Sequence, residues 1–307
     1  MTADELIKVA RHVAVVVASG GGISVLALSP MIVVGWRLHR RKLSYKAEAI
    51  DPLTEMPMRP PGESLRTKLE ELSEKFDNEI AVTFMVTIGV AVYGSCLVMM
   101  GDANPVVLTF LGVVAIVAAV SAWWSLKKLQ RQLWDHRLGF DGERVVGEWL
   151  HRLAADGFEI FHDMPFDNFN IDHIIVGPPG VFAIETKTRR KPAGLRGSAK
   201  ATVVFDGTSL RYPSGAPETQ ALEQATLNAK TLSKFLSSST GEFTPVNAIL
   251  ALPGWWVDRK ARGAVKVLNP KEIQNSFSSK DGPPLSSQRI KQIAHQLTER
   301  CRLEKAK

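Results

Sequence analysis

Two acidic side chains, Asp172 and Glu185, stand at the outer ends of a predicted β-hairpin, and Lys187 follows on the second strand. If the two carboxylates share one face of the hairpin, they repel each other. One of them must then take up a proton, or the hairpin loses stability, unless a cation neutralises the pair. Because carboxylate oxygens are preferred ligands of Mg²⁺ and similar ions, we expect Asp172 and Glu185 to hold a divalent metal. The alternative is a salt-bridge cluster on the protein surface.

The hairpin that positions these residues is predicted by two short runs rich in Val and Ile, joined by the Gly-Pro-Pro-Gly loop at 177–180. Such runs around a Gly/Pro cluster are typical of antiparallel strands. Pairing Val176 with Val181 places Asp172 directly opposite Glu185, with Cβ atoms roughly 4.5–5.5 Å apart. Strand alternation adds the lysine to the same face and sends His173 to the other face, where we expect a structural role.

A known signature resembles these residues. Asp172 followed by the Glu-Thr-Lys run at 185–187 resembles the Asp…(Asp/Glu)-x-Lys signature of the restriction-endonuclease-like, or PD-(D/E)XK, nucleases. The upstream pair Gly142-Glu143, the Asp-His dipeptide and the hairpin glycines make residues 139–270 similar to the nuclease-related domain, NERD, of that superfamily.

This resemblance implies an α/β fold with a restriction-endonuclease-like mixed β-sheet flanked by helices. It implies that Mg²⁺ or Mn²⁺, held by Asp172 and Glu185, activates a water for cleavage of a phosphodiester. It gives Lys187 the role of orienting that water or stabilising the transition state. The implied partner is nucleic acid, with DNA as the expected substrate.

Two further residues are candidates for the same site. Glu143 falls on the inward face of a helix that starts near Gly142, and the resemblance gives it an active-site role; the alternative is an ordinary first-turn glutamate favoured by the helix dipole. Gln224 flanks the core stripe of a predicted helix over 224–236 and is similar to a glutamine that supports the family's site. It could equally be a helix-surface amide, since the family's preceding Asn-Pro is missing.

A basic stretch follows the catalytic lysine, with no acidic residue from 186 to 205. A track of cations beside a metal site suits the phosphates of a nucleic acid backbone, although charge runs are usually solvated faces. The chain departs from the family here, because Arg189 stands where a tryptophan usually follows the lysine closely. The candidate nucleic-acid-binding residues are Arg189, Arg190, Lys191, Arg196 and Lys200.

The first part of the chain predicts three transmembrane helices. Residues 13–36, 80–100 and 106–126 carry no charge and are long enough to cross a hydrocarbon core. The alternative for the first run is a cleaved signal peptide, but several cations follow it like a stop-transfer sequence. The second and third runs are close enough to form a helical hairpin.

Cations flank the ends of the first and third runs, whereas the hairpin tip carries only Asp102. The positive-inside rule therefore places the N-terminus outside and everything after the third span in the cytoplasm, in the inner (plasma) membrane of a prokaryote. The expected organisation is a first span within 1–36, a cytoplasmic linker with an amphipathic helix at 37–79, the hairpin at 80–126, a juxtamembrane linker at 127–138, the nuclease-like domain at 139–270 and a C-terminal helical extension at 271–307.

Composition fits this organisation. The net charge of +7 permits a phosphate-bearing partner without requiring one, and two cysteines without metal-type spacing argue against a zinc site or a disulfide framework. We therefore expect a membrane-anchored, Mg²⁺-dependent nuclease whose partners are nucleic acid and the lipid bilayer. Two alternatives remain open: a non-catalytic membrane adaptor that keeps the fold and binds nucleic acid or a protein, and a membrane scaffold with a vestigial domain.

Overall fold

The structure is a computed structural model that describes residues 57–101, 104–167, 169–192, 201–213, 215–277 and 284–302. The chain divides into two compact units. In the described part, the first unit comprises residues 72–132, and the second comprises residues 57–71 together with everything from residue 133 onward. The predicted first span at 13–36 lies outside the described residues, as does the start of the predicted linker.

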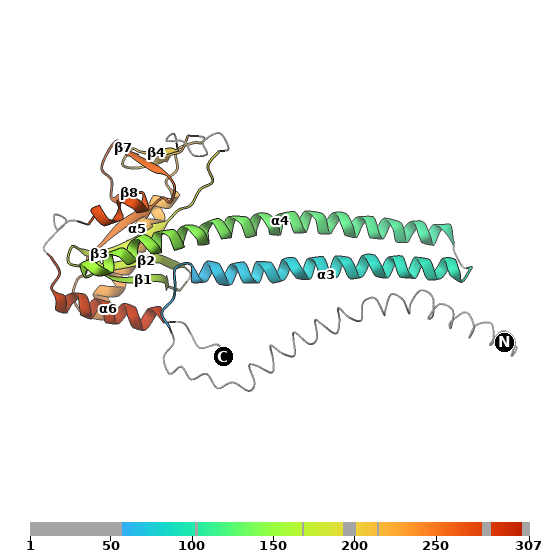
Figure 1. Cartoon of the computed structure of the whole chain (residues 1–307), viewed down its shortest axis with the longest axis horizontal. Helices are drawn as coiled ribbons and strands as arrows, with labels where there is room; N and C mark the ends of the chain where they lie inside the picture. Colours follow the sequence, from blue (N-terminus) through green and yellow to red (C-terminus); the bar gives the residue numbers. More distant parts are fainter. Residues whose placement is uncertain are drawn as a thin grey trace, which may run out of the picture. The chain divides into compact units, whose positions relative to one another are not determined.

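Two long helices make up the first unit, in which α3 (Glu63–Met99) and α4 (Pro105–His151) run antiparallel and side by side (Figure 1). Residues 80–99 of α3 and 106–126 of α4 carry no charge, and hydroxyl side chains there donate hydrogen bonds to carbonyls one turn earlier, as Thr83 does to Glu79 and Thr109 to Pro105. A hydroxyl satisfied within its own helix needs no water, which suits an apolar environment.

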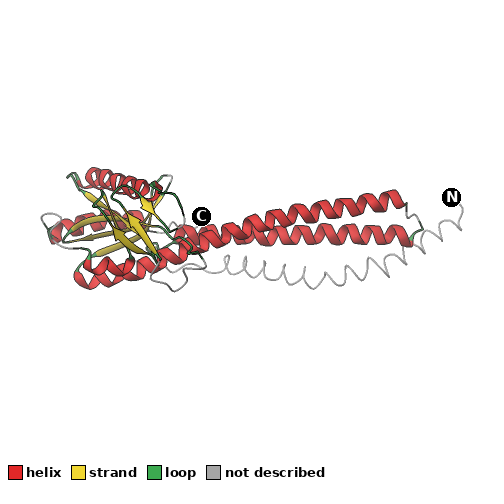
Figure 2. Ribbon diagram, turned by 90° about the horizontal axis from the view of Figure 1, so that it is seen from above, coloured by secondary structure: helices red, strands yellow, loops and turns green. Residues whose placement is uncertain are grey.

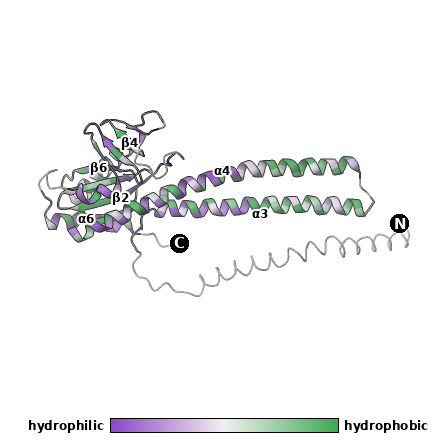
Figure 3. Cartoon of the chain, turned by 45° about the horizontal axis from the view of Figure 1, so that its top comes forward, coloured by the Kyte–Doolittle hydropathy of each residue, from purple (hydrophilic) through white to green (hydrophobic). Residues whose placement is uncertain are grey.

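Both helices are long and apolar enough to cross a membrane, by length and composition alone. Figure 3 shows the hydrophobic colour concentrated on the halves of α3 and α4 that adjoin their connection. Large apolar side chains such as Phe84, Phe110 and Trp124 are exposed along them. The sequence predicted an amphipathic helix leading into a separate span, whereas the structure has one continuous helix, because no proline lies within α3. In the same way, the expected juxtamembrane linker at 127–138 is helical and belongs to α4.

A five-stranded mixed sheet is the centre of the second unit, with the strand order β1-β2-β3-β6-β8. β1, β2 and β3 are antiparallel neighbours, and β3, β6 and β8 are parallel. Figure 2 shows the strands in yellow with helices in red around them. The strands are β1 (Glu159–Pro165), β2 (Asn170–Gly177), β3 (Gly180–Thr186), β6 (Val246–Ala251) and β8 (Val265–Leu268).

The β2–β3 hairpin has the predicted register. Val176 pairs with Val181, and His173 pairs with Ile184. The ladder also includes Gly177 opposite Gly180, so the turn contains only two residues instead of the expected four. The next pair outward in this register is Asp172 and Glu185, which places both acids at the same end of the sheet.

Helices cover both faces of this sheet. On one face, α5 (Gln220–Thr240) and α6 (Ser287–Cys301) pack through Leu232, Leu236 and Ile293 against the side chains of Ile174 and Ala183. The other face packs against the last turns of α4, the 3₁₀ helix η2 (Arg152–Asp156) and the 3₁₀ helix η4 (Pro270–Asn275). β2 and β3 are therefore buried on both faces, which explains their nearly continuous apolar sequence.

A second sheet has three short strands in the order β5-β4-β7. They are β4 (Thr202–Phe205), β5 (Leu210–Arg211) and β7 (Trp256–Arg259). Trp255, which precedes β7, is buried in the core beneath them, and its indole N–H donates to the carbonyl of Arg189 at 3.2 Å.

The start of α3 belongs to the second unit. A Cβ on Gly62 would lie 2.7 Å from the ring of Phe140, and a Cβ on Gly139 would lie 3.2 Å from Leu65, so the first turns of α3 run closely along α4. The amide of Arg59 also donates to the carbonyl of Cys301 at the end of α6. A segment expected to be a linker is thus packed into the sheet-containing unit.

Candidate active site

Three carboxylates from three elements form an acid cluster, which we define as Glu143, Asp172 and Glu185. Glu143 comes from α4, Asp172 from the start of β2 and Glu185 from the end of β3. The charge of each of the other two contributes to the raised pKa of Asp172, which shows that all three are electrostatic neighbours. The structure therefore brings together the three acids that the sequence singled out.

Hydrogen bonds fix the two hairpin acids. Asp172 accepts the backbone N–H of Thr186 at 2.7 Å, so its side chain continues the β2–β3 ladder beyond the last backbone pair. Glu185 accepts a hydrogen bond from the amide of Asn228 at 2.8 Å, and the oxygen of Asn228 in turn accepts one from Gln224 at 2.8 Å. Gln224 thus supports Glu185 at one remove, through a residue that is fully buried.

The lack of a side chain at Gly142 allows α4 to bring Glu143 close to the other two acids. A Cβ on Gly142 would lie 2.5 Å from Oγ1 and 2.8 Å from Cγ2 of Thr188, just beyond the end of β3. A helix can approach this segment so closely only where it lacks a side chain. Glu143 is 7 % exposed, and its Oε2 has no hydrogen-bond partner among the described residues.

A fourth acid, Asp163, lies beside the cluster on β1, opposite Asp172 in the register that pairs His162 with His173. Its φ of 47° is the one positive value at a described non-glycine residue. The strained backbone is held by four donors to its carboxylate: the side chain of Arg59, the amide and hydroxyl of Ser64, and the amide of Asn170. We call this set of contacts the Asp163 clasp.

The acid cluster carries strongly shifted pKa values. Burial, together with the charges of Asp163 and Glu185, raises the pKa of Glu143 to about 8. Burial and the neighbouring acids hold the pKa of Asp172 well above its ordinary value, against the opposing effect of the Thr186 N–H. Burial raises the pKa of Glu185 to about 7, although Lys187 and Asn228 both favour its charged form. Crowded acids with raised pKa values are typical of sites that bind a cation or do acid–base chemistry.

Lys187 lies at the same end of β3. Its amide donates to the carbonyl of Ala251 on β6 at 3.0 Å, which anchors the backbone, and its side chain is partly exposed. The ammonium lowers the pKa of Glu185, so it lies near that carboxylate.

Of the predicted nucleic-acid-binding residues, three lie among the described residues. Arg189 forms an ion pair with Glu218 and lies over the ring of Tyr212, while Arg190 pairs with Asp135 at 3.0 Å. Glu218 is only partly exposed, whereas both partners of the Arg190 pair are exposed. Exposed pairs contribute little stability, so Arg190 can exchange its partner. Lys191 lies exposed near Trp255. Arg196 and Lys200 lie outside the described residues.

His173 lies away from the acids, as alternation predicts. Its Nδ1 is 2.8 Å from Nδ1 of His162, whose Nε2 is 3.1 Å from Nε2 of His151. Burial lowers the pKa of His173 and lowers that of His162 to about 3, so both imidazoles stay neutral in the fold.

Sequence reasoning missed two parts of the site. Asn228 could have been found, because it lies four residues after Gln224 on the same helical face. Asp163 and its partners Arg59 and Ser64 could not, because nothing in the spacing relates a residue of β1 to residues before or at the start of α3.

No group of three or more His, Cys, Asp or Glu side chains in the described ranges has the arrangement of a complete metal site. The ligand set that the sequence predicts is different: the two hairpin acids with further oxygen atoms from water or substrate.

Comparison with known proteins agrees with the resemblance. The family model described as the nuclease-related domain, NERD, matches residues 138–253. No curated protein and no solved structure matched the chain. The match includes all three acids of the cluster, as well as Lys187 and Gln224. It leaves out Arg59 and Ser64 of the Asp163 clasp. Residues 138–253 of this chain form a nuclease-related domain.

Proposed function

We propose that the chain is a membrane-anchored nuclease that hydrolyses phosphodiester bonds in nucleic acid, with DNA as the expected substrate and Mg²⁺ or Mn²⁺ as the cofactor. One observation supports this above the others. Asp172 and Glu185 stand at one end of the sheet beside Lys187, within a nuclease-related domain whose mixed sheet is consistent with the restriction-endonuclease-like fold.

The residues fit a divalent cation. Hard oxygen donors crowd together, and Oε2 of Glu143 is buried without a hydrogen-bond partner. A cation beside Asp172 would offset the repulsion from Glu185 and Glu143 that, in addition to burial, raises the pKa of Asp172. When bound there, the ion would activate a water and offset charge on the phosphate.

The surrounding residues act on position and charge. The Thr186 N–H and the Asn228 amide hold the carboxylates of Asp172 and Glu185 in place. Lys187 supplies a positive charge beside Glu185, where it stabilises negative charge that develops on the scissile phosphate. Arg189, Arg190 and Lys191 follow on the same segment and bind phosphates of the nucleic acid backbone, a role that extends to Arg196 and Lys200.

The membrane part of the proposal is based on α3 and α4, whose apolar windows suit a bilayer. The cations that follow the predicted first and third spans place the nuclease-related domain in the cytoplasm and the N-terminus outside, in the inner membrane.

The test uses the full-length chain in an uncharged detergent, with labelled duplex DNA, single-stranded DNA and RNA, in Mg²⁺, Mn²⁺ or EDTA. We expect metal-dependent cleavage that is lost in Lys187→Ala, because the lysine acts on the transition state. The same variant should still fold and still bind Mn²⁺. The matched control is Lys291→Ala, at an exposed lysine of α6 that has no role in the proposed site, and it should cleave at the wild-type rate.

Cleavage by Lys187→Ala at the wild-type rate would refute the catalytic role of the lysine. Absence of cleavage by the wild type in every metal and substrate, together with retained nucleic acid binding, would instead identify a non-catalytic adaptor.

A further inference from the structure

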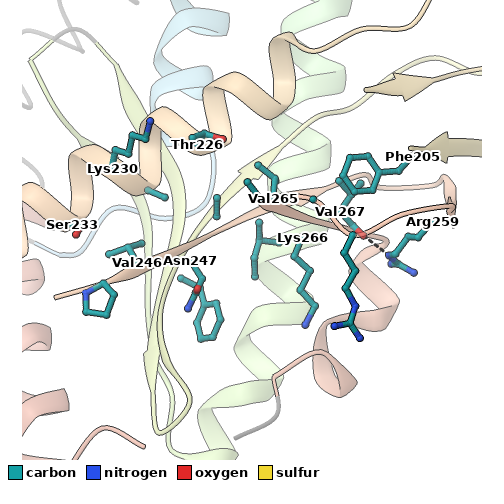
Figure 4. A pocket seen from close by; sticks show the side chains of 18 of the residues that line it. Phe205, Thr226, Lys230, Ser233, Val246, Asn247, Arg259, Val265, Lys266 and Val267 are labelled. Atoms are coloured by element: carbon teal, nitrogen blue, oxygen red, sulfur yellow. Dashed lines mark hydrogen bonds between the residues drawn. The ribbon is translucent and has the colours of Figure 1, made fainter. Parts of the chain in front are cut away.

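A large hollow lies on the second unit at the end of the sheet away from the acid cluster. Its volume is about 1600 Å³, and it is lined by α5, by the first residues of β6 and β8, and by the connection from β7 to β8. In Figure 4, Thr226, Lys230 and Ser233 lie along α5, while Asn247 and Lys266 lie on the strands below. Val246 of the hollow pairs with Val181 near the start of β3, whereas Glu185 lies near the end of β3.

Cations dominate the charge of this hollow, and no acidic residue is among those that line it. Arg259 and Lys260 are paired with Glu272 and Asp258, respectively. Lys266 donates to the backbone carbonyl of Ser276, so its charge is not neutralised by an acid. The lining cations are Lys230, Lys234, Arg259, Lys260, Arg262 and Lys266.

Three of the six, Lys230, Lys234 and Arg262, have no ion pair with any described residue, and all three are exposed. Cations gathered in a concave surface without acids create a positive potential that favours a polyanion.

Hydrogen-bonding side chains and an aromatic ring accompany these cations. Ser233 and Asn247 supply hydroxyl and amide groups, and Phe243, which is 78 % exposed, lies in the loop after α5. Sites that bind single-stranded nucleic acid combine cations, which contact the phosphates, with an exposed aromatic ring on which a base can stack. A duplex keeps its base faces inside the stack and could not use the ring.

The helix α5 connects this hollow with the acid cluster. Residues at a spacing of four and three, Thr226, Lys230 and Ser233, line the hollow, whereas Gln224 and Asn228 face Glu185. One rigid element thus presents both surfaces, so a strand held in the hollow would be held at a fixed offset from the carboxylates.

We propose that this hollow binds a single strand of nucleic acid through its phosphates, as a contact separate from the acid cluster and the basic stretch beside it. The partner is nucleic acid, as in the proposed function, but binding in the hollow does not depend on cleavage.

Fluorescence anisotropy tests the proposal, with a labelled single-stranded oligonucleotide and its duplex, the full-length chain in uncharged detergent, and EDTA to prevent cleavage. The double variant Lys230→Glu/Lys234→Glu should weaken single-strand binding by at least about fivefold. It should also reduce the slope of log K against log salt by about 1.4, since each phosphate contact contributes about 0.7 for single strands. Phe243→Ala should weaken binding by about fivefold or more without changing the slope, because stacking is not a charge effect.

The matched control is Lys75→Glu/Lys291→Glu, which makes the same change in charge at exposed lysines that do not line the hollow. Wild-type affinity and slope in the hollow variant, or an equal loss in the control, would overturn the proposal. So would a loss of binding to anionic lipid vesicles with no loss of oligonucleotide binding, since that result would assign the hollow to a membrane surface. Loss of cleavage with unchanged oligonucleotide binding in the hollow, as expected for Lys187→Ala, would concern the catalytic proposal alone.

Discussion

The two hairpin acids illustrate how a residue-level prediction follows from strand register. Asp172 and Glu185 were expected to face each other because a one-residue slip would send one of them to the other side of the sheet. The structure has that register, and each carboxylate is held by one hydrogen bond from the fold. What remains to be measured is whether the pair binds a metal.

We predict that Asp172→Asn and Glu185→Gln each abolish Mn²⁺ binding to the full-length chain. Either change removes one of two charged ligands, and the remaining carboxylate is too weak a site alone. Isothermal titration calorimetry with Mn²⁺ measures the effect. Asp167→Asn, at an exposed acid in the β1–β2 connection, is the control and should bind as the wild type does. Unchanged affinity in both site variants would refute the assignment.

The raised pKa of Glu143 gives a second prediction at this scale. Because its pKa rises from an ordinary value near 4.5 to about 8 in the fold, the folded state favours the protonated acid. Stability from this group is therefore present below pH 4.5 and is lost as the pH rises through 8. Asp172 and Glu185 act in the same direction.

In EDTA, Glu143→Gln should therefore raise the melting temperature relative to the wild type by an amount that grows between pH 5 and pH 8, to roughly 5 °C. Thermal melts at several pH values check this, with Glu148→Gln, an exposed acid on the same helix, as the control that should show no trend. Saturating Mn²⁺ should reduce the difference in melting temperature between Glu143→Gln and the wild type at high pH, since the ion takes the place of the protons. A difference that does not depend on pH would contradict the expectation.

At the scale of elements, the approach of α4 to β3 depends on one missing side chain. Gly142→Ala would place a Cβ 2.5 Å from the Thr188 hydroxyl, so the Thr188 side chain or the segment of α4 that carries Glu143 must shift. We predict a loss of about 1–3 kcal/mol in the free energy of unfolding, the usual range for overpacking, and a lower cleavage rate.

Gly112→Ala provides a control on the same helix, because nothing lies within 4 Å of its added Cβ. That change should be neutral or stabilising by up to about 1 kcal/mol, as alanine is the better helix former. Shortening the side chain in Gly142→Ala/Thr188→Ala should recover part of the loss. Equal stability of Gly142→Ala and the wild type would show that the close approach is not required.

The elements differ in how far the sequence could predict them. The β2–β3 hairpin, α5 and the C-terminal helix α6 were predicted because alternation, Gly/Pro turns and helical spacing are local signals. β1 and the three-stranded sheet were not, because their strands are short and their pairing depends on distant partners. The left-handed backbone of Asp163 could not be predicted at all, since Arg59 and Ser64 stabilise it from another part of the chain.

For the whole molecule, the membrane topology is the prediction that matters most. The asymmetry of the flanking cations predicts that the connection between α3 and α4 lies outside and the C-terminus inside. Fusions of a phosphatase that is active only outside the cytoplasm, made after Gly101 and after Lys307, should be active and inactive, respectively. Fluorescent-protein fusions at the same positions should give the opposite pattern. Equal activity of the phosphatase at both positions would refute the topology.

Residues 57–71, which pack beside α4, have a consequence for the architecture of the chain. Gly62 lies against Phe140 and Leu65 against Gly139, so the two passages of the chain through the second unit run antiparallel as neighbours. In topological terms, residues 72–132 are an insertion into a discontinuous domain, entered and left at adjacent points. Helices packed about 8–10 Å apart can be joined by a turn of about 2–5 residues. Excising the insertion in favour of such a turn would preserve the Asp163 clasp and the acid cluster, whereas cutting the chain at the bounds of the family match would remove the clasp.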